Sequence, residues 1–271
     1  MTDLDLTGAS VVVTGGGHGI GRALAERFAA EGAKVTVADV HGARAEKIAT
    51  RIGGLAVTCD VGDRAAVADL VARATAAHGP VDVFCSNAGI LDRAPGLTPT
   101  AEQVEAITRV NLLAHVWAAQ EVLPSMLERG GGHLVQTISS AGLISGVADM
   151  GYTFTKHGAL GLAEWIAVNY AHLGIHVTCL CPNVVNTGMI GRDEDAEEAA
   201  GGGSGAVPGG LGDVVEPEEC AALVLDAMRA GRFLALPHPR VGESFARKAA
   251  GYDDWIAGTN RRLRRMRGED V

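Results

Sequence analysis

The chain has 271 residues, of which 47% are hydrophobic and 20% charged, enough for one large domain with a buried core. Its formal net charge of −9 and isoelectric point near 5.4 argue against nucleic acid or an anionic membrane as a partner. The N-terminus has no basic start followed by an apolar stretch, as a signal peptide would. No apolar run approaches the roughly 20 residues that span a bilayer.

The cysteines lie mostly inside apolar, strand-like runs. An odd number of them in that setting predicts reduced thiols in a cytoplasmic protein. Cys179 and Cys181 could suggest a metal pair, but no second pair or nearby histidine cluster completes a site. Buried structural thiols and no metal are therefore expected. The five cysteines are Cys59, Cys85, Cys179, Cys181 and Cys220.

Short apolar runs alternate with segments of helical periodicity along most of the chain. The first run, residues 9–14, is rich in valine and predicts a buried strand. Such alternation predicts an α/β fold with a parallel, doubly wound sheet of about seven strands and helices on both faces. Ligands bind these sheets at the carboxyl ends of the strands. Strands are expected at residues 9–14, 34–38, 55–59, 81–86, 133–138 and 175–181, and helices at 22–31, 64–78, 103–129 and 151–173.

A glycine-rich turn follows the first expected strand. A strand, a glycine turn and a helix are the setting of a dinucleotide site. The glycines let the backbone approach the pyrophosphate, and the helix N-terminus favours its negative charge. The alternative is a tight turn that binds no ligand. The turn has the sequence Thr14-Gly15-Gly16-Gly17-His18-Gly19-Ile20-Gly21.

Asp39 ends the second expected strand, eighteen residues after Gly21. A carboxylate at about this distance binds the adenosine ribose hydroxyls. It also repels a 2′-phosphate, and neither position 18 nor position 40 holds an arginine or lysine that could receive one. The position therefore predicts NAD rather than NADP as the cofactor. The alternative is an aspartate that caps the next helix.

Tyr152 and Lys156 lie four residues apart in an expected helix, which places both side chains on one face. An ammonium beside a phenol favours the phenolate, so the pKa of Tyr152 is expected to fall from about 10. Such a tyrosine can exchange a proton with an alcohol or ketone near neutral pH. Ser139, thirteen positions earlier, is placed to hold the same oxygen. Taken alone, the pair also fits a helix surface with an aromatic ring and a salt-bridging lysine.

Several short motifs in the same order resemble the short-chain dehydrogenase/reductase family, over about residues 6–236. The resemblance implies a Rossmann-type fold, here one domain over residues 1–271, and an NAD-dependent oxidoreductase acting on CH–OH groups. It makes Tyr152 the general acid/base. Lys156 would lower the tyrosine pKa and bind the nicotinamide ribose, Ser139 would orient the substrate oxygen, and Asn111 would hold a water in the proton relay. The motifs are Thr14-Gly15-x-x-x-Gly19-Ile20-Gly21, Asp60-Val61, Asn87-Ala88-Gly89, Asn111, Ser139, Tyr152 with Lys156, and Pro182.

The resemblance also implies cofactor contacts along the strand ends. Asn87 and Gly89 would line the adenine and ribose side, and Val185 and Thr187 would hold the carboxamide. The expected cofactor-binding residues are Gly15, Gly17, His18, Gly19, Ile20, Gly21, Asp39, Asp60, Val61, Asn87, Ala88, Gly89, Tyr152, Lys156, Pro182, Val185 and Thr187.

Two positions depart from the family pattern. Ser86 stands where the family's Asn-Asn-Ala-Gly has its first asparagine, and Asn183 stands where its Pro-Gly has the glycine. Asparagine tolerates a positive φ better than most residues but lacks the freedom of glycine, so this departure bears on the pocket wall. Ser140 competes with Ser139 as the active-site serine, and the thirteen-residue separation from Tyr152 favours Ser139.

The sequence thus predicts an oxidoreductase that transfers hydride between NAD(H) and a secondary alcohol or ketone. A 3-oxoacyl thioester reductase is a second interpretation, although such enzymes commonly use NADPH, which Asp39 disfavours. A dinucleotide-binding sensor without turnover is a third, although a broken Ser/Tyr/Lys set would be expected of it. Apolar candidates suggest a lipophilic substrate, and each could equally belong to the core. The expected substrate residues are Ser139, Leu91, Ile144, Asn183, Met189 and Ile190.

The helix after Tyr152 carries a stripe of alanines at four-residue spacing. Together with the resemblance, the stripe predicts a homo-oligomer, a tetramer, because small residues let another element approach closely. The stripe could also pack on the chain's own sheet. Its members are Ala159, Ala163, Ala167 and Ala171.

Two segments in the last third of the chain carry further expectations. Residues 188–215 are acidic in the middle and then rich in glycine, which predicts a mobile lid over the substrate, or a slack insertion without a catalytic role. Residues 241–267 predict a docked helical tail that ends in an arginine run. The expected docking stripe is Phe245, Ala249, Tyr252 and Ile256.

Overall fold

The computed structural model of the protein describes residues 4–91, 98–145, 149–188 and 214–269. Seven strands form one sheet in the order β3-β2-β1-β4-β5-β6-β7, and all neighbours are parallel. This sheet confirms the predicted fold class. The order reverses between β1 and β4, which is the point where doubly wound sheets bind ligands. The strands are β1 Ser10–Thr14, β2 Lys34–Asp39, β3 Leu55–Thr58, β4 Val83–Ser86, β5 Gly132–Thr137, β6 Ile175–Leu180 and β7 Leu234–Ala235.

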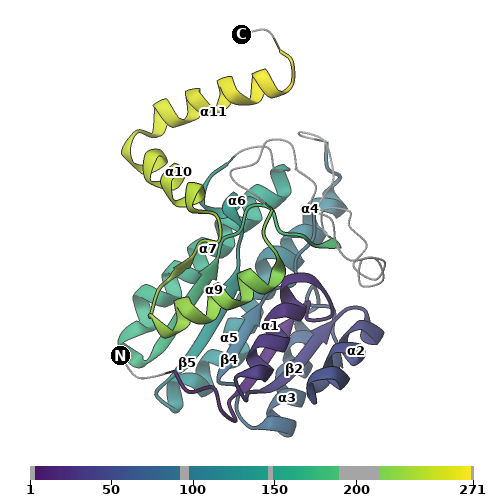
Figure 1. Ribbon diagram of the computed structural model, residues 1–271. Helices are drawn as coiled ribbons and strands as arrows, with labels where there is room; N and C mark the ends of the chain where they lie inside the picture. The colour runs from purple at the N-terminus through teal and green to yellow at the C-terminus, as the bar shows by residue number, and fades with distance from the viewer. Residues whose placement is uncertain (1–3, 92–97, 146–148, 189–213, 270–271) are drawn as a thin grey trace.

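Helices cover both faces of the sheet (Figure 1). α1, α2 and α9 share one hydrophobic core with the sheet, and α3, α5 and α7 share the other. Within the described ranges, no helix combines the length and apolar content needed to cross a membrane. The helices are α1 Gly19–Ala30, α2 Gly42–Ile52, α3 Arg64–His78, α4 Ala101–Thr108, α5 Ala114–Glu128, α6 Ser140–Leu143, α7 Met150–Tyr170, α9 Pro217–Arg229, α10 Pro239–Ala250 and α11 Tyr252–Met266, with a π-helical turn η1 Arg109–Leu113 and a 3-10 turn η2 Ala171–Leu173.

β1 shows why the valine-rich run becomes a central strand. Every residue of it is buried, because a parallel strand in the middle of a covered sheet has no solvent face. Val11 and Val13 point into the core shared with α1, and Val12 points into the core shared with α3. Because side chains alternate along a strand, the valine-rich run of β1 contributes side chains to both hydrophobic cores.

The single helix expected at residues 103–129 is wrong as one element. The chain forms α4, then the π-helical turn η1, and then α5. A π-helical turn is wider than an α-helical one and is found mostly as an isolated bulge, frequently at functional sites. Asn111 lies at the centre of this turn and is fully buried.

The C-terminal tail is two helices rather than the one docked helix that was expected. α10 and α11 are separated at Gly251. Phe245 on α10 packs against the core, whereas Tyr252 and Ile256 on α11 are 56% and 50% exposed. Figure 1 shows α11 extending away from the sheet at the top of the view. The expected apolar stripe does not dock as one face, because the break between the helices redirects its second half.

The predicted lid at residues 188–215, with Met189 and Ile190, lies almost entirely outside the described residues. Its two described flanks are joined to each other. Val185 and Val215 form an isolated parallel β-bridge. The segment therefore leaves and re-enters the described structure at one place.

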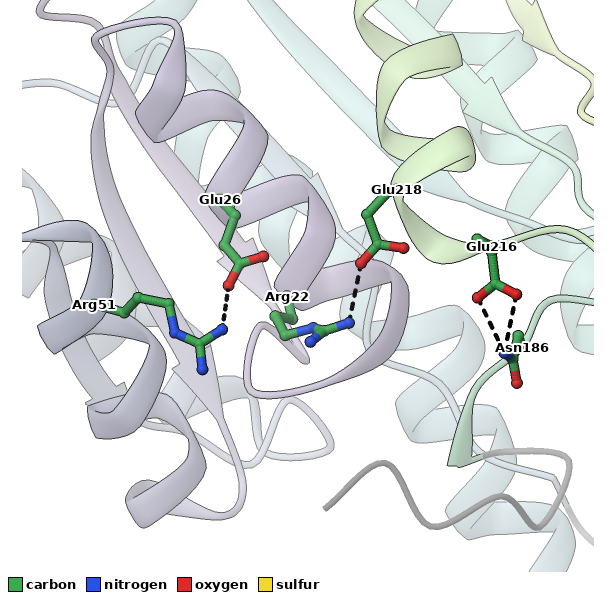
Figure 2. Close-up of polar contacts among 6 residues, drawn as sticks. All are labelled: Arg22, Glu26, Arg51, Asn186, Glu216 and Glu218. Atoms are coloured by element: carbon green, nitrogen blue, oxygen red, sulfur yellow. Dashed lines mark hydrogen bonds and ion pairs between the residues drawn. The ribbon is translucent and has the colours of Figure 1, made fainter. Parts of the chain in front are cut away.

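Polar contacts link this place to the face covered by α1 and α9 (Figure 2). The Asn186 side-chain amide donates to both carboxylate oxygens of Glu216, at N···O distances of 3.0 Å. Glu216 is the N-cap of α9. In the first turn of the same helix, Glu218 pairs with Arg22 of α1 at 3.1 Å. These exposed contacts contribute little free energy each, but they fix the register of α9 beside α1.

Candidate active site

A cavity of about 480 Å³ opens at the carboxyl edge of the sheet, within the size range of ligand and cofactor sites. One side, here called the glycine-turn wall, is drawn from residues 15–21, 39–44 and 59–61. The other, the serine wall, is drawn from residues 137–139, 152–156 and 182–187. The predicted site residues that line the cavity are Gly15, His18, Gly19, Ile20, Gly21, Asp39, Asp60, Val61, Asn87, Ala88, Gly89, Ser139, Tyr152, Lys156, Pro182, Asn183, Val185 and Thr187.

Four described residues of the predicted set do not line the cavity. Gly17 and Asn111 lie just behind it, in contact with lining residues. Ile144 is 7% exposed and belongs to the core shared with α7, so its role as a substrate residue stays a prediction that the cavity lining does not support. Leu91 is partly buried and does not line the cavity either.

The glycine turn brings the start of α1 against the end of β1. Gly15 has φ of +61° and lies so close to Ala88 that a Cβ atom would come within 3.0 Å of its backbone. A Cβ at Gly21 would collide with the carbonyl oxygen of Gly15. Both positions therefore require glycine. His18 precedes α1 without a side-chain cap on the helix, and its buried Nδ1 has no partner among the described residues. This uncapped N-terminus faces the cavity and suits a phosphate group.

Asp39 is buried at the end of β2 and holds the glycine turn through the backbone. Its Oδ2 accepts the N–H of Gly17 at 3.0 Å, and its Oδ1 accepts the N–H of His41 at 2.9 Å. Each carboxylate oxygen can accept a further hydrogen bond from a ligand hydroxyl. Arg44 on α2 also lines the cavity, and the sequence analysis missed it. It follows Asp39 by five positions, beyond the neighbouring positions considered there.

Asn87 ties three neighbouring strands together at the switch point. Its Nδ2 donates to the carbonyl of Thr14 at 2.9 Å, and its N–H donates to Thr14 Oγ1 at 3.0 Å. Its Oδ1 accepts the hydroxyl of Thr137 at 3.0 Å. The side chain thus joins the ends of β1, β4 and β5. The Asn-Ala-Gly motif supports the shape of the cavity as well as lining it.

Tyr152, Lys156 and Ser139 converge on the serine wall. α7 carries the first two, and Ser139 follows β5 and caps α6, where its Oγ accepts the N–H of Ala141 at 3.1 Å. The Tyr152 hydroxyl is hydrogen-bonded to Ser139. Lys156 is 2% exposed, donates to the carbonyl of Thr137 at 2.8 Å and lies 5.6 Å from the centre of the Tyr152 ring.

The electrostatics of this trio differ from the sequence-based expectation. Burial raises the pKa of Tyr152, and its hydrogen bond with Ser139 opposes that rise. The predicted fall is wrong for this structure, because the Lys156 ammonium is directed at the Thr137 carbonyl and does not outweigh the desolvation of the phenolate. Burial also lowers the pKa of Lys156 to about 8, so it keeps its proton at neutral pH.

Asn111 uses its side chain to hold the loop after β4. Its Oδ1 accepts the N–H of Ile90 at 2.8 Å, and its Nδ2 donates to the carbonyl of Ile90 at 2.9 Å. Ile90 in turn lines the cavity. The reciprocal pair fixes the backbone of Ile90 opposite the serine wall. The side-chain amide is therefore already occupied by protein partners on both of its polar atoms.

The only non-glycine residue with a positive φ in the described ranges is Ser139, at +153°. Asn183, which stands where the family pattern has a glycine, does not adopt a positive φ. The strained backbone at Ser139 is held by neighbours: the Ser140 N–H donates to the carbonyl of Pro182 at 2.7 Å, and the Ser140 hydroxyl donates to Asn183 Oδ1 at 3.2 Å. A residue persists in such a conformation only where its surroundings determine it strongly. Ser139 faces Tyr152, while Ser140 braces the wall from behind.

Other lining residues had no motif of their own in the sequence. Val40 and His41 follow the predicted Asp39 directly, and Cys59 precedes the predicted Asp60. A rule that extends each strand-end motif by two residues would have found them. Further lining residues without such a motif are Arg44, Val110, Thr137 and Ile138.

Comparison with known proteins agrees with this geometry. Residues 9–198 match the family model described as short chain dehydrogenase. The chain is 35% identical over 232 residues to 1-deoxy-11-beta-hydroxypentalenate dehydrogenase from Streptomyces exfoliatus, covering 83% of this chain and 81% of that one. It is 32% identical over 222 residues to estradiol 17-beta-dehydrogenase 11 from Pongo abelii, covering 79% and 69%.

A solved structure shows the same fold with a cofactor in place. A short-chain dehydrogenase/reductase from Burkholderia phymatum in complex with NAD superimposes with a TM-score of 0.76 at 25% identity, covering 90% of this chain and 93% of that one. The fold thus supports a nicotinamide dinucleotide as cofactor, and the relatives support oxidoreductase chemistry on alcohol and ketone groups. This chain belongs to the short-chain dehydrogenase family.

Proposed function

We propose that the protein is an NAD-dependent oxidoreductase that interconverts a secondary alcohol and its ketone, with Tyr152 as the general acid/base. The observation that carries the proposal is the Tyr152–Ser139 hydrogen bond beside the buried Lys156, on the wall of a cavity of about 480 Å³. Two hydroxyls that meet beside a cation form a site for one substrate oxygen.

The residues divide the chemistry between them. A nicotinamide dinucleotide, when bound, supplies or accepts the hydride. Ser139 orients the substrate oxygen, and Tyr152 gives it a proton in ketone reduction or takes one in alcohol oxidation. Its raised pKa keeps the hydroxyl protonated, which suits the acid role. Lys156 stabilises the phenolate that follows proton donation, because it remains cationic at neutral pH.

The residues of the glycine-turn wall fit a dinucleotide. The uncapped start of α1 would hold the pyrophosphate, and Asp39 would accept the ribose hydroxyls. Lys156 and the segment from Pro182 to Thr187 would hold the nicotinamide end, as the family resemblance implies. The Asn111 side chain uses one N–H and one lone pair on Ile90, so a relay water at Asn111 would bind the second N–H, the second lone pair or the main chain.

We propose NAD as the preferred cofactor because the Asp39 carboxylate would lie beside a 2′-phosphate and repel it. Arg44 weakens this argument, because it lines the same end of the cavity and could pair with a phosphate. The hydrogen bonds from Gly17 and His41 keep Asp39 fixed in the wall. The carboxylate cannot turn away to make room for the phosphate without losing both bonds.

The decisive experiment follows NADH formation with a panel of secondary alcohols and then compares Tyr152→Phe on the fastest of them. The variant should bind NAD with unchanged affinity and lose about 10²–10⁴-fold in kcat, the usual contribution of positioned acid–base catalysis. Wild-type turnover by Tyr152→Phe would exclude the role. NAD binding without turnover of any alcohol or ketone would favour the non-catalytic sensor. Selective turnover of 3-oxoacyl thioesters would favour the thioester reductase.

We also propose a homo-oligomer, a tetramer by family resemblance, but from a different face of α7. Ala159 and Ala163 are buried in the chain's own core and Ala167 packs against it, whereas Ala171 is exposed, so most of the alanine stripe packs on this chain. The opposite face exposes Phe154, Trp165 and Val168, at 40%, 54% and 81%. An apolar face of this kind supports association with a second copy. A stable monomer by light scattering at micromolar concentration would contradict this proposal.

A cytoplasmic location and a single domain over residues 1–271 remain proposals of the same kind. The five cysteines are all free and buried. Thiols that form no disulfide support a reducing compartment.

A further inference from the structure

Lys248 on α10 is an unusual lysine, because it is 7% exposed although lysine is rarely buried. Its ammonium donates to the carbonyl of Leu143 at 2.8 Å. Among the described residues no carboxylate pairs with it. The charge is met by the faces of two rings, with Nζ 5.5 Å from the Tyr252 centroid and 5.3 Å from the Trp255 centroid.

A fourth partner comes from α7. Lys248 Nζ lies 3.4 Å from Nε2 of His157, the residue next to Lys156. The Nδ1 of His157 lies 3.0 Å from the carbonyl of Thr153. A carbonyl only accepts, so Nδ1 carries the hydrogen and Nε2 is left to accept from the ammonium. Lys248 thus joins α10 to α7 as well as to α6.

The Leu143 carbonyl has a particular place. It belongs to the last residue of α6, a helix of four residues that begins directly after Ser139. The carbonyls at a helix C-terminus lack partners within the helix and favour a cation. Lys248 therefore holds one end of α6 while the strained Ser139 stands at the other end.

A second link runs from the start of α10 to the same wall. The buried His238 accepts the N–H of Asn183 through Nδ1 at 3.1 Å, and Asn183 Oδ1 accepts the hydroxyl of Ser140. Two points on the C-terminal segment, ten residues apart in the chain, thus support the wall that carries Ser139. A strained residue needs such support from several sides.

We infer that Lys248 is a positioning residue for the active-site serine: by holding the Leu143 carbonyl and His157, it fixes α6 and keeps Ser139 in its strained conformation against Tyr152. The inference rests on the proposed function for its kinetic consequence but not for its structural one. Under this inference, the C-terminal helix α10 contributes to catalysis by positioning Ser139 and does not contact the substrate.

The test compares Lys248→Met with Arg247→Met. The first removes the ammonium and keeps a similar aliphatic stem, and the second removes one positive charge from the adjacent, exposed position of α10. Hydrogen exchange is measured on both variants with NAD present. The amides of Gly142 and Ile144, which close α6, should exchange about tenfold faster in Lys248→Met only, the ratio expected for one lost hydrogen bond.

Kinetics supply the second measurement, with NAD and the fastest alcohol of the panel. For Lys248→Met we expect kcat to fall by about tenfold or more, because small displacements of a positioned group are costly, and the Kd for NAD to stay within about twofold. Arg247→Met should match the parent in both. If exchange in α6 and kcat of Lys248→Met both equal those of Arg247→Met, the inference is overturned.

Failure of this inference is distinguishable from failure of the proposed function. Should Tyr152→Phe keep full turnover, the proposed function fails, and the exchange measurement still decides what Lys248 does to α6. If Lys248→Met does not fold, Lys248→Gln takes its place, since its amide keeps one donor for Leu143. The amides of α6 must then exchange faster in Lys248→Gln than in Arg247→Met, by less than the tenfold factor expected for Lys248→Met. Equal rates in Lys248→Gln and Arg247→Met would overturn the inference.

Discussion

The glycine-turn wall and the serine wall enclose one cavity but are built in different ways. In the first, the contacts join neighbouring strand ends: Asp39 of β2 holds Gly17 after β1, and Asn87 after β4 holds Thr14 of β1. In the second, the contacts join the wall to a helical segment outside the sheet. Lys248 of α10 holds Leu143 at the end of α6, and His238, just before α10, holds Asn183.

This difference has a consequence for how the two walls respond to change. The first wall is part of the sheet, and its geometry follows wherever the parallel strands form. The second depends on whether α10, α6 and α7 are packed against one another. Perturbation of distant helices should therefore change the chemical step while cofactor binding persists.

The largest expected effect is a loss of folding stability in acid, caused by a buried histidine beneath the serine wall. His115 on α5 is buried against Gln136 of β5, and burial lowers its pKa from 6.5 to about 3. The folded state then binds fewer protons than the unfolded state between pH 6.5 and 3, so stability falls as the pH falls through that window. For this one group the loss between pH 7 and pH 4 is about 3 kcal/mol.

The measurement is urea unfolding at a series of pH values. His115→Gln keeps a neutral polar group and should flatten the fall in unfolding free energy between pH 6.5 and 4. His172→Gln removes an exposed histidine and serves as the control. Burial lowers the pKa of His133 to about 3 as well, so part of the slope should persist in His115→Gln. An unchanged slope would contradict the buried, neutral state of His115.

The second-largest effect is expected from Ser139→Ala, which should impair catalysis at the serine wall and leave cofactor binding at the glycine-turn wall unchanged. It removes the hydroxyl that meets Tyr152, and we expect kcat/KM for the alcohol to fall about 100-fold, as for other positioned donors. The affinity for NAD should stay within about twofold of the parent, a difference that fluorescence titration resolves. Ser140→Ala is the matched control, since it removes a hydroxyl from the same turn that bonds Asn183 instead. Equal losses in the two variants would show that the wall, not the Ser139–Tyr152 contact, is responsible.

Asp39→Ala should change the cofactor preference, which depends on the glycine-turn wall, and leave the serine wall intact. Removing the carboxylate removes the repulsion of a 2′-phosphate, which Arg44 at the same end of the cavity could then pair with, so the preference for NAD over NADP should narrow about tenfold. The comparison is kcat/KM with each cofactor. Asp39→Ala combined with Arg44→Ala should recover less NADP activity than Asp39→Ala alone. A parent enzyme that prefers NADP would refute the cofactor assignment.

The smallest effect is expected from Asn183→Gly. It restores the glycine of the family pattern but removes the acceptor for the Ser140 hydroxyl. The main-chain N–H that donates to His238 is kept. We expect kcat to fall no more than about threefold, in keeping with the loss of one neutral hydrogen bond at the edge of the wall. A larger fall, with steady-state kinetics on the same alcohol, would place Asn183 in direct contact with the substrate.

The parts of the fold that the sequence predicted are those that local rules determine. The valine-rich run of β1, the glycine turn and Asp39 share one short stretch, and strand–helix alternation is enough to predict a parallel sheet. Lining residues such as Gly15, Asp60 and Ser139 were found because they follow strand ends. Each of these inferences uses residues that lie within about twenty positions of each other.

The parts that the sequence did not predict depend on three-dimensional packing. The π-helical turn at Asn111 has no signature in helical periodicity, because its apolar spacing resembles that of the flanking helices. The pKa of Tyr152 was predicted in the wrong direction, since spacing shows that Lys156 is near but not that burial dominates. Lys248 carried no expectation of its own within the predicted tail, and the contact with Leu143 distinguishes it.

The cysteines lend themselves to a use outside the chemistry discussed so far. All five thiols are buried, and burial raises the pKa of Cys59 to about 11 and of Cys181 and Cys220 to about 12, with the same direction for Cys85 and Cys179. Thiolates, not thiols, react with alkylating dyes. The native chain is therefore close to a cysteine-free background for labelling. One cysteine placed on the exposed face of α11 would carry a fluorophore alone, without removal of any native thiol.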